Sequence, residues 1–206
     1  MGSQRPQAFR IVVDSREQAP WTFDSAPVYE GTSVTVSSLP TGDYSVEGFQ
    51  DAVAVERKSL PDLVACLGRE RDRFARELAR ARGLESFAVV IEGSFTDLKQ
   101  GQYRSMLNPH SACQSICAFM ARWHIPFVFA GTRAAAEYAT WSLLRQFVEG
   151  KRHELRAVEK ALGSPAGACA RGTHEHTQDE PQDLLEAFGG PAEAHPGMVP
   201  EGGATC

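Results

Sequence analysis

Residues 53–63 read VAVERKSLPDL, and in this stretch three charged side chains directly follow residues typical of a buried strand. Val53 to Val55 are apolar, whereas Glu56, Arg57 and Lys58 come next without an intervening turn. Arginine and lysine rarely stand beside a core unless they have a function there. The alternative is an ordinary solvated run of charges. The other side chains that lie near the end of this strand decide between the two interpretations.

A second acidic side chain is expected opposite Glu56. Residues 42–46 and 52–56 predict the two strands of a hairpin, joined by the turn EGFQD. Facing residues of a hairpin have a nearly constant sum of residue numbers, which places Asp43 opposite Glu56. Two carboxylates this close repel each other, so they indicate a bound cation, a shared proton or a basic partner.

A divalent cation and a phosphate would explain these charges together. Mg²⁺ accepts one or two carboxylates, a backbone carbonyl, waters and phosphate oxygens, and Asp43, Glu56 and the carbonyl of Arg57 would supply such a set. Lys58 lies on the same face of the strand as Glu56, because side chains alternate. Its ammonium can orient or help to deprotonate an attacking water and offset charge on a phosphate. The pattern predicts a metal-dependent phosphodiester hydrolase.

Strands and helices alternate along the rest of the chain. Ser59 is expected to cap a helix, with Pro61 in the first turn and Asp62 three residues after the cap. Apolar runs predict further strands at 9–13, 33–39, 86–93 and 125–131, and helical spacing predicts helices at 69–82, 108–124, 132–150 and 151–163. This order predicts an α/β fold with a mixed β-sheet flanked by helices.

Composition suits one globular domain followed by an acidic tail. Of the 206 residues, 42% are hydrophobic and 23% are charged. Residues 164–206 hold one arginine against seven acidic residues, so residues 1–163 are nearly neutral although the net charge is −5. Seven glycines and five prolines predict that this tail is disordered. No secretory signal or membrane span is expected, and five cysteines without disulfide-type spacing favour reduced thiols in the cytoplasm.

Three segments in this order resemble a known family. VVDSRE at 12–17, GDY at 42–44 and VERKSLPDL at 55–63 are similar to the XPF-type endonuclease domain, a branch of the PD-(D/E)xK nuclease superfamily. The likeness extends over residues 9–150 and includes RFAREL at 73–78 and VVIEG at 89–93. It implies a restriction-endonuclease-like nuclease fold. The implied activity is that of a DNA endonuclease that uses Mg²⁺ or Mn²⁺ and acts on branched, flap or fork DNA in replication, recombination or repair.

The same resemblance assigns roles to individual residues. It implies metal binding by Asp43, Glu56, the Arg57 carbonyl and Asp14, with catalytic or supporting roles for Lys58, Arg57, Glu17 and Arg16. Larger relatives carry a tandem helix-hairpin-helix module after the nuclease, for which residues 164–206 are too few and too polar. The chain therefore looks like the compact versions carried by bacteria and their phages. A catalytically inactive DNA-binding or scaffold domain of the same fold is the alternative, although the presence of Asp43, Glu56 and Lys58 favours the enzyme.

Arginines on the predicted helix at 69–82 indicate where DNA could lie. At 100° per residue, four of them fall within about 60° of one another, opposite Leu67, Phe74, Leu78 and Ala81. Such a stripe suits contacts to backbone phosphates, whereas ion pairs such as Arg73–Glu77 are the alternative. Together with Arg16, the predicted DNA-binding residues are Arg69, Arg73, Arg76 and Arg80.

Two helices and the tail suggest further contacts. The predicted helix at 108–124 has an apolar face that predicts core packing, formed by Cys113, Ile116, Cys117, Phe119, Met120 and Trp123. A zinc site that combines these cysteines with His110 and His124 is not expected, because one straight helix cannot surround an ion. Residues 133–149 are apolar on more than one face, which is consistent with the homodimer that the resemblance implies. The segment QDLLEAFGG in the tail is a candidate helix for a protein partner.

Overall fold

Six strands form one mixed sheet in the computed structural model, which describes residues 8–163. The strand order is β2-β1-β3-β4-β5-β6. Strand β1 pairs in parallel with β2 and antiparallel with β3, β3 pairs antiparallel with β4, and the β4–β5 and β5–β6 pairs are parallel. The strands are β1 (Phe9–Asp14), β2 (Thr32–Ser37), β3 (Tyr44–Val46), β4 (Val53–Ser59), β5 (Ser86–Glu92) and β6 (Phe127–Phe129).

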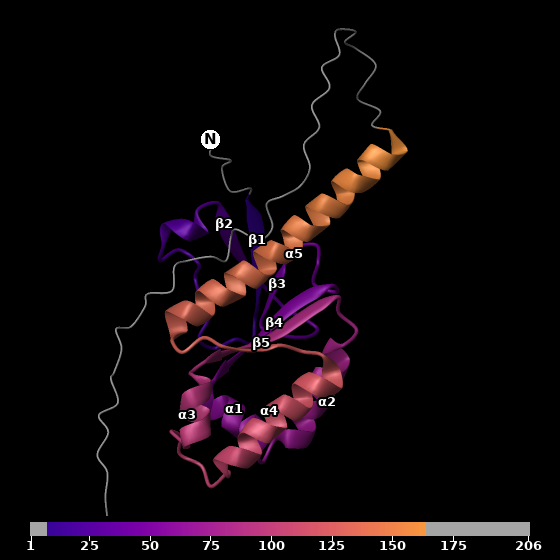
Figure 1. The fold of residues 1–206 in the computed structure, drawn as a ribbon. Helices are drawn as coiled ribbons and strands as arrows, with labels where there is room; N and C mark the ends of the chain where they lie inside the picture. The colour runs from indigo at the N-terminus through magenta and orange to yellow at the C-terminus, as the bar shows by residue number, and fades with distance from the viewer. Residues whose placement is uncertain (1–7, 164–206) are drawn as a thin grey trace, which may run out of the picture. The chain divides into compact units, whose positions relative to one another are not determined.

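Helices cover both faces of this sheet (Figure 1), so the predicted α/β fold with a mixed sheet is confirmed. The long helix α5 lies across one face, and the four shorter α-helices lie on the other. The helices are η1 (Pro27–Tyr29), α1 (Leu60–Leu67), α2 (Arg71–Ala81), α3 (Phe95–Gln100), α4 (Pro109–Trp123) and α5 (Arg133–Leu162). Among the described residues, none of the helices has the length and apolar character needed to cross a membrane.

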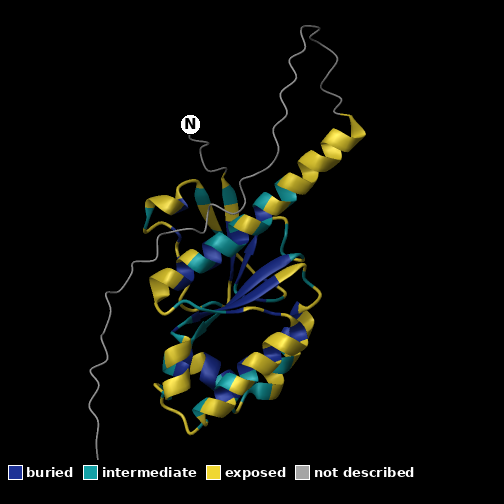
Figure 2. Ribbon diagram, in the orientation of Figure 1, coloured by how far each residue is buried: buried dark blue, intermediate teal, exposed yellow. Residues whose placement is uncertain are grey.

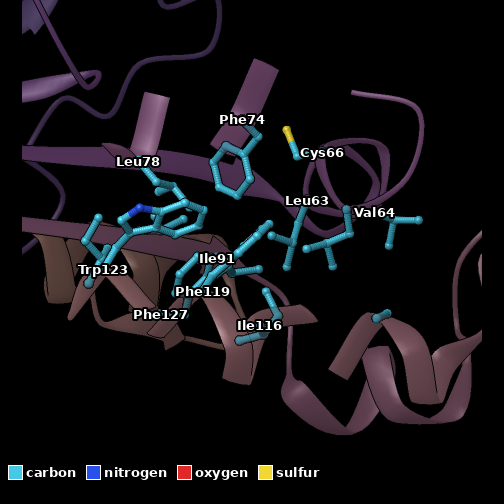
Figure 3. Packing of buried hydrophobic residues seen from close by; sticks show 14 of the residues in the cluster. Leu63, Val64, Cys66, Phe74, Leu78, Ile91, Ile116, Phe119, Trp123 and Phe127 are labelled. Carbon is cyan, nitrogen blue, oxygen red and sulfur yellow. The ribbon is translucent and has the colours of Figure 1, made fainter. Parts of the chain in front are cut away.

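Each face of the sheet has its own apolar core because side chains alternate along the strands. In β4, Val53 and Val55 pack towards α5 with Trp141 and Leu144, whereas Ala54 packs towards the other helices. Figure 3 shows this second core, in which α1, α2 and α4 meet β5 and β6. Its labelled members are Leu63, Val64, Cys66, Phe74, Leu78, Ile91, Ile116, Phe119, Trp123 and Phe127.

Several predicted helix boundaries and faces need correction. The helices expected at 132–150 and 151–163 are one 30-residue helix, α5, which runs through Gly150 and whose distal part is exposed (Figure 2). Helix α2 begins at Arg71, so Arg69 lies in the preceding turn. On α4, Cys117 and Met120 are exposed rather than part of the core. The sequence interpretation also missed α3 and η1, whereas the tail and its QDLLEAFGG segment lie outside the described residues.

The hairpin register agrees with the prediction. Tyr44 pairs with Val55, and the amide of Asp43 donates to the carbonyl of Val55 at 2.9 Å. Gly42 permits this close entry into β3: its φ is +76°, and a Cβ added there would lie 2.9 Å from the Cβ of Ala54. Gly48, in the turn of the same hairpin, has a similar φ of +83° but no atom near its missing Cβ.

These two glycines provide a matched pair of substitutions. Gly48→Ala should destabilise the fold by about 1–2 kcal/mol, which is the cost of the left-handed conformation for an L-residue. Gly42→Ala should cost about 1–3 kcal/mol more, because it adds overpacking against β4. Urea denaturation of both variants measures the difference. Equal losses would show that the approach of Gly42 to β4 is not tight.

Candidate active site

Charged residues gather where the strands of the sheet end. Asp14 closes β1, Glu56 to Lys58 lie in the last part of β4, and Glu92 closes β5. Asp43 directly precedes β3, which runs in the opposite direction to β1 and β4. All of these residues therefore lie at the same end of the sheet, the end at which parallel strands of α/β folds bind ligands.

The backbone fixes the position of Asp43. Its carbonyl accepts from the amide of Asp14 at 2.8 Å, and its Oδ2 accepts from the amide of Arg57 at 2.8 Å. Since the amide and carbonyl of one strand residue point to the same side, the Arg57 carbonyl is also directed towards β3. The carboxylate of Asp43 and the Arg57 carbonyl thus lie at one edge of β4, as the sequence pattern predicted.

The charged triplet of β4 divides between the two faces of the sheet. Glu56 and Lys58 share the face of Ala54, where the Lys58 ammonium contacts Glu56 Oε1 and lies 5.8 Å from the ring centre of Phe74. Arg57 projects to the α5 face. Glu56 and Lys58 therefore lie on the same face, as side-chain alternation predicts, whereas Arg57 lies on the opposite face.

Glu56 is buried and Asp43 is partly buried beside it, and this environment raises the pKa values of both acids. Burial raises the pKa of Asp43 to about 6, against the opposing effects of the Arg57 amide and the Lys58 ammonium. Burial and the nearby Asp43 raise the pKa of Glu56 to about 8, and Lys58 offsets only part of this shift. Burial alone would lower the pKa of Lys58, but Glu56 outweighs it and raises this pKa. Lys58 is therefore positively charged at neutral pH.

The oxygen donors of this site fit a hard divalent cation. The carboxylates of Asp43 and Glu56 and a backbone carbonyl lie at one edge of β4, and Lys58 offsets only part of the effect of burial on the two acids. Within residues 8–163, no group of three or more His, Cys, Asp or Glu side chains is arranged to hold a metal ion. Mg²⁺ does not require such a group, since waters and phosphate oxygens complete its coordination.

Asp14 is committed to hydrogen bonds within the protein. Its Oδ1 accepts from the amide and Nε of Arg16 at 2.7 and 2.8 Å, and its Oδ2 accepts from Arg16 Nη2 and the Leu39 amide at 2.8 and 2.7 Å. Above all the Arg16 side chain lowers the pKa of Asp14 to about 2. This geometry gives Asp14 a positioning role, and its role in metal binding stays a prediction.

A network that sequence reasoning missed holds Arg57. Glu92 accepts from Arg57 Nε and Nη2, both at 2.9 Å, and from Arg133 Nη1 at 2.9 Å. Glu17, which was predicted to lie at the site, contacts Arg57 Nη1 at 3.4 Å. Both guanidinium groups lie over the ring of Trp21. Glu92 ends a buried strand, as Asp14 does, and this signal could have identified it. Arg133 lies 41 residues further on and gives no local signal.

A cavity of about 750 Å³ opens beside the acids and Lys58. Arg69 and Arg73 line it, and their side chains are mostly exposed, although both contact Glu70. The ion pair of Arg73 thus forms with Glu70 and not with Glu77, the partner named in the alternative interpretation. A smaller cavity on the far side of Asp43 and Glu56 is lined by Arg80 and Glu77. Arg76 is exposed but lines neither cavity. The larger cavity is lined by Arg16, Glu17, Gln18, Ala19, Asp43, Glu56, Arg57, Lys58, Ser59, Asp62, Ala65, Cys66, Arg69, Glu70 and Arg73.

Asp62 has the structural role that the sequence indicates. Its amide donates to the Ser59 hydroxyl at 3.2 Å, and that hydroxyl donates to Asp62 Oδ2 at 2.6 Å, which caps α1 directly after Lys58. The predicted cap at Ser59 is confirmed. The cap marks the point where β4 ends and α1 begins.

Comparisons with known proteins agree with this architecture. A model of the ERCC4 domain family matches residues 13–141. Among solved structures, XPF from Aeropyrum pernix has a TM-score of 0.50 at 21% sequence identity, with 83% of this chain and 69% of that chain covered. The same protein in a complex with DNA has a TM-score of 0.51 at 23% identity, with 71% and 66% covered. Comparison with curated proteins gives no match. The predicted restriction-endonuclease-like nuclease fold and the XPF-type resemblance are confirmed.

The raised pKa values predict how the stability of the cation-free protein depends on pH. The folded state holds protons on Asp43 and Glu56 to about pH 6 and 8, above their ordinary values of 3.8 and 4.5. Stability from these groups is therefore full below about pH 4 and is lost as pH rises towards 8. Asp43→Asn should recover about 1–3 kcal/mol at pH 8.

Urea denaturation in the presence of EDTA at pH 5.5 and pH 8 measures this effect. Glu47→Gln on the same hairpin is the control, because Glu47 is half exposed and paired with Arg10. If wild type and Asp43→Asn lose stability equally between the two pH values, the buried acids do not interact as described.

Proposed function

The chain belongs to the ERCC4 domain family, a family of DNA nucleases, and we propose that it is a Mg²⁺- or Mn²⁺-dependent endonuclease that cuts branched DNA. The observation that carries this proposal is the convergence of Asp43, Glu56 and the Arg57 carbonyl beside Lys58, at the floor of a cavity edged by arginines. The residues of the proposed site lie inside the segment that matches the family.

The residues of this site divide the chemistry among themselves. Asp43, Glu56 and the Arg57 carbonyl would hold the cation, which when bound polarises a phosphate and lowers the pKa of a coordinated water. Lys58, which stays protonated, donates hydrogen bonds and offsets charge that develops on the phosphate oxygens. Arg57 holds Asp43 through its amide and is itself held by Glu92.

Arginines at the rim of the cavity would hold the DNA backbone. The side chains of Arg16, Arg69 and Arg73 are 71%, 80% and 68% exposed, so phosphates can approach them although Arg16 pairs with Asp14 and the other two with Glu70. Such contacts give affinity without sequence information, and their strength falls with salt. The alternative function, a DNA-binding scaffold without catalysis, would use these arginines but would not need the buried acids.

Substitution of the acid and the lysine separates the two functions. Asp43→Ala and Lys58→Ala should each reduce cleavage of flap DNA in Mn²⁺ by about 100- to 1000-fold, because each removes charge stabilisation at the reacting phosphate. DNA binding measured by fluorescence polarisation should change much less. Glu47→Gln, an exposed acid of the same hairpin, should cleave normally.

A panel of labelled flap, fork and plain duplex DNA gives the decisive outcomes. Cleavage that survives both substitutions would refute the site. Binding by wild type without cleavage of any substrate would support the scaffold. Equal cleavage of all three substrates would refute the preference for branched DNA.

We also propose that the protein forms a homodimer through α5. The distal part of this helix exposes Leu155, Val158 and Leu162, with exposed fractions of 58%, 52% and 81%. These residues recur at positions i, i+3 and i+7, so they lie on one side of the helix as an apolar stripe. A second copy of α5 offers the same stripe in return.

Light scattering at micromolar concentration tests this assembly. Wild type and Lys160→Glu, which changes the opposite side of the helix, should have the mass of a dimer. Leu155→Glu should give a monomer, because it places a charge within the apolar contact. A monomeric wild type would contradict the proposal.

A further inference from the structure

A second groove lies beside the proposed active site and has no part in the chemistry described above. Its volume is about 570 Å³, and it runs between α1 and the loop that follows α3. The two cavities share three lining residues, Asp62, Ala65 and Arg69. These residues are spaced i, i+3 and i+7, so they form a ridge along one side of α1 and the turn after it. The groove and the active-site cavity are therefore neighbours that meet at these three residues.

The lining of this groove suits a nucleic-acid strand. Arg69 and Arg104 are exposed cations, and Gln102 and Ser105 add polar side chains. The one acidic side chain in the lining, Asp62, already accepts from the Ser59 hydroxyl. Tyr103 lines the groove and is partly buried, and an aromatic ring in a cationic groove is a platform on which unpaired bases stack.

The loop after α3 is held in place by its own hydrogen bonds. The Gln102 amide donates to the Asp97 carbonyl at 2.8 Å, and the Tyr103 hydroxyl donates to the Leu107 carbonyl at 3.0 Å. Asn108 then caps α4. Within this ordered loop, Met106 is fully exposed, at 101% of its reference area. Methionine is among the apolar side chains that DNA-binding proteins insert between base steps, where they disturb the stacking.

We propose that this groove receives the single strand that leaves the active site at a DNA branch. Arg69 and Arg104 would contact its phosphates, Tyr103 would stack on a base, and Met106 would pack against the last base pair of the duplex. The inference rests on the proposed function and adds a physical source for the preference for branched DNA. Stacking on Tyr103 requires a base that is not stacked within a duplex, so an unpaired strand can use this contact and a continuous duplex cannot.

Binding measurements test the groove independently of catalysis. In the Asp43→Ala background, Arg104→Ala and Met106→Ser should each weaken the affinity for flap DNA by about tenfold, as loss of a phosphate or stacking contact does. Their affinity for plain duplex should change less than about twofold. Arg122→Ala, at the opposite end of α4, is the matched control and should bind both substrates as the background protein does. Thermal melting checks that each variant folds.

The outcomes separate this inference from the proposed function. Unchanged flap affinity in Arg104→Ala and Met106→Ser would overturn the groove, whether or not the wild type cleaves DNA. Equal losses on flap and plain duplex would also overturn it, because they would indicate general electrostatic attraction. If no substrate is cleaved but the variants lose flap affinity selectively, the groove stands and the nuclease proposal fails.

Discussion

The antiparallel pairing of β3 with β4 is the constraint on which the site depends. The register of Tyr44 with Val55 brings Asp43 to the end of β4. The Arg57 amide then binds the Asp43 side chain, and the Asp14 amide binds the Asp43 carbonyl. A shift of one residue in this register would turn Asp43 or Glu56 to the other face of the sheet. The tight entry at Gly42, where a Cβ would meet Ala54, helps to exclude such a shift.

The same pairing places two carboxylates where neither is well solvated. Burial raises the pKa of both, and Lys58 compensates them only in part. Raised pKa values of this kind are common at functional sites, where a bound ligand can supply the opposite charge. The surrounding ion pairs have the opposite character. Glu92 is shared by Arg57 and Arg133 at 2.9 Å, which ties β4 and β5 to the start of α5. The ion pairs around Arg57 thus compensate one another, whereas the charges of Asp43 and Glu56 are compensated only in part.

Much of this arrangement could be predicted from the sequence, because its signals are local. The turn EGFQD predicts the hairpin register, and alternation along β4 predicts that Glu56 and Lys58 share one face. Ser59 predicts the start of α1. Contacts between distant segments could not be read in this way. Arg133 reaches Glu92 only after the chain has crossed α3, α4 and β6. The Leu39 amide likewise reaches Asp14 from another loop, and no local signal in the sequence indicates this anchoring hydrogen bond. Helix α5 passes Gly150 without a break, since one glycine costs only about 1 kcal/mol.

Divalent-cation binding by this strand pair is the central claim, and anomalous diffraction from crystals grown with Mn²⁺ tests it most directly. We expect one strong peak at the end of β4, about 2.1 Å from carboxylate oxygens of Asp43 and Glu56 and from the carbonyl of Arg57. In the same crystals Asp14 should keep its hydrogen bonds to Arg16 and Leu39. A Mn²⁺ ion bound at another position, or held by Asp14 while Asp43 remains uncoordinated, would contradict the account.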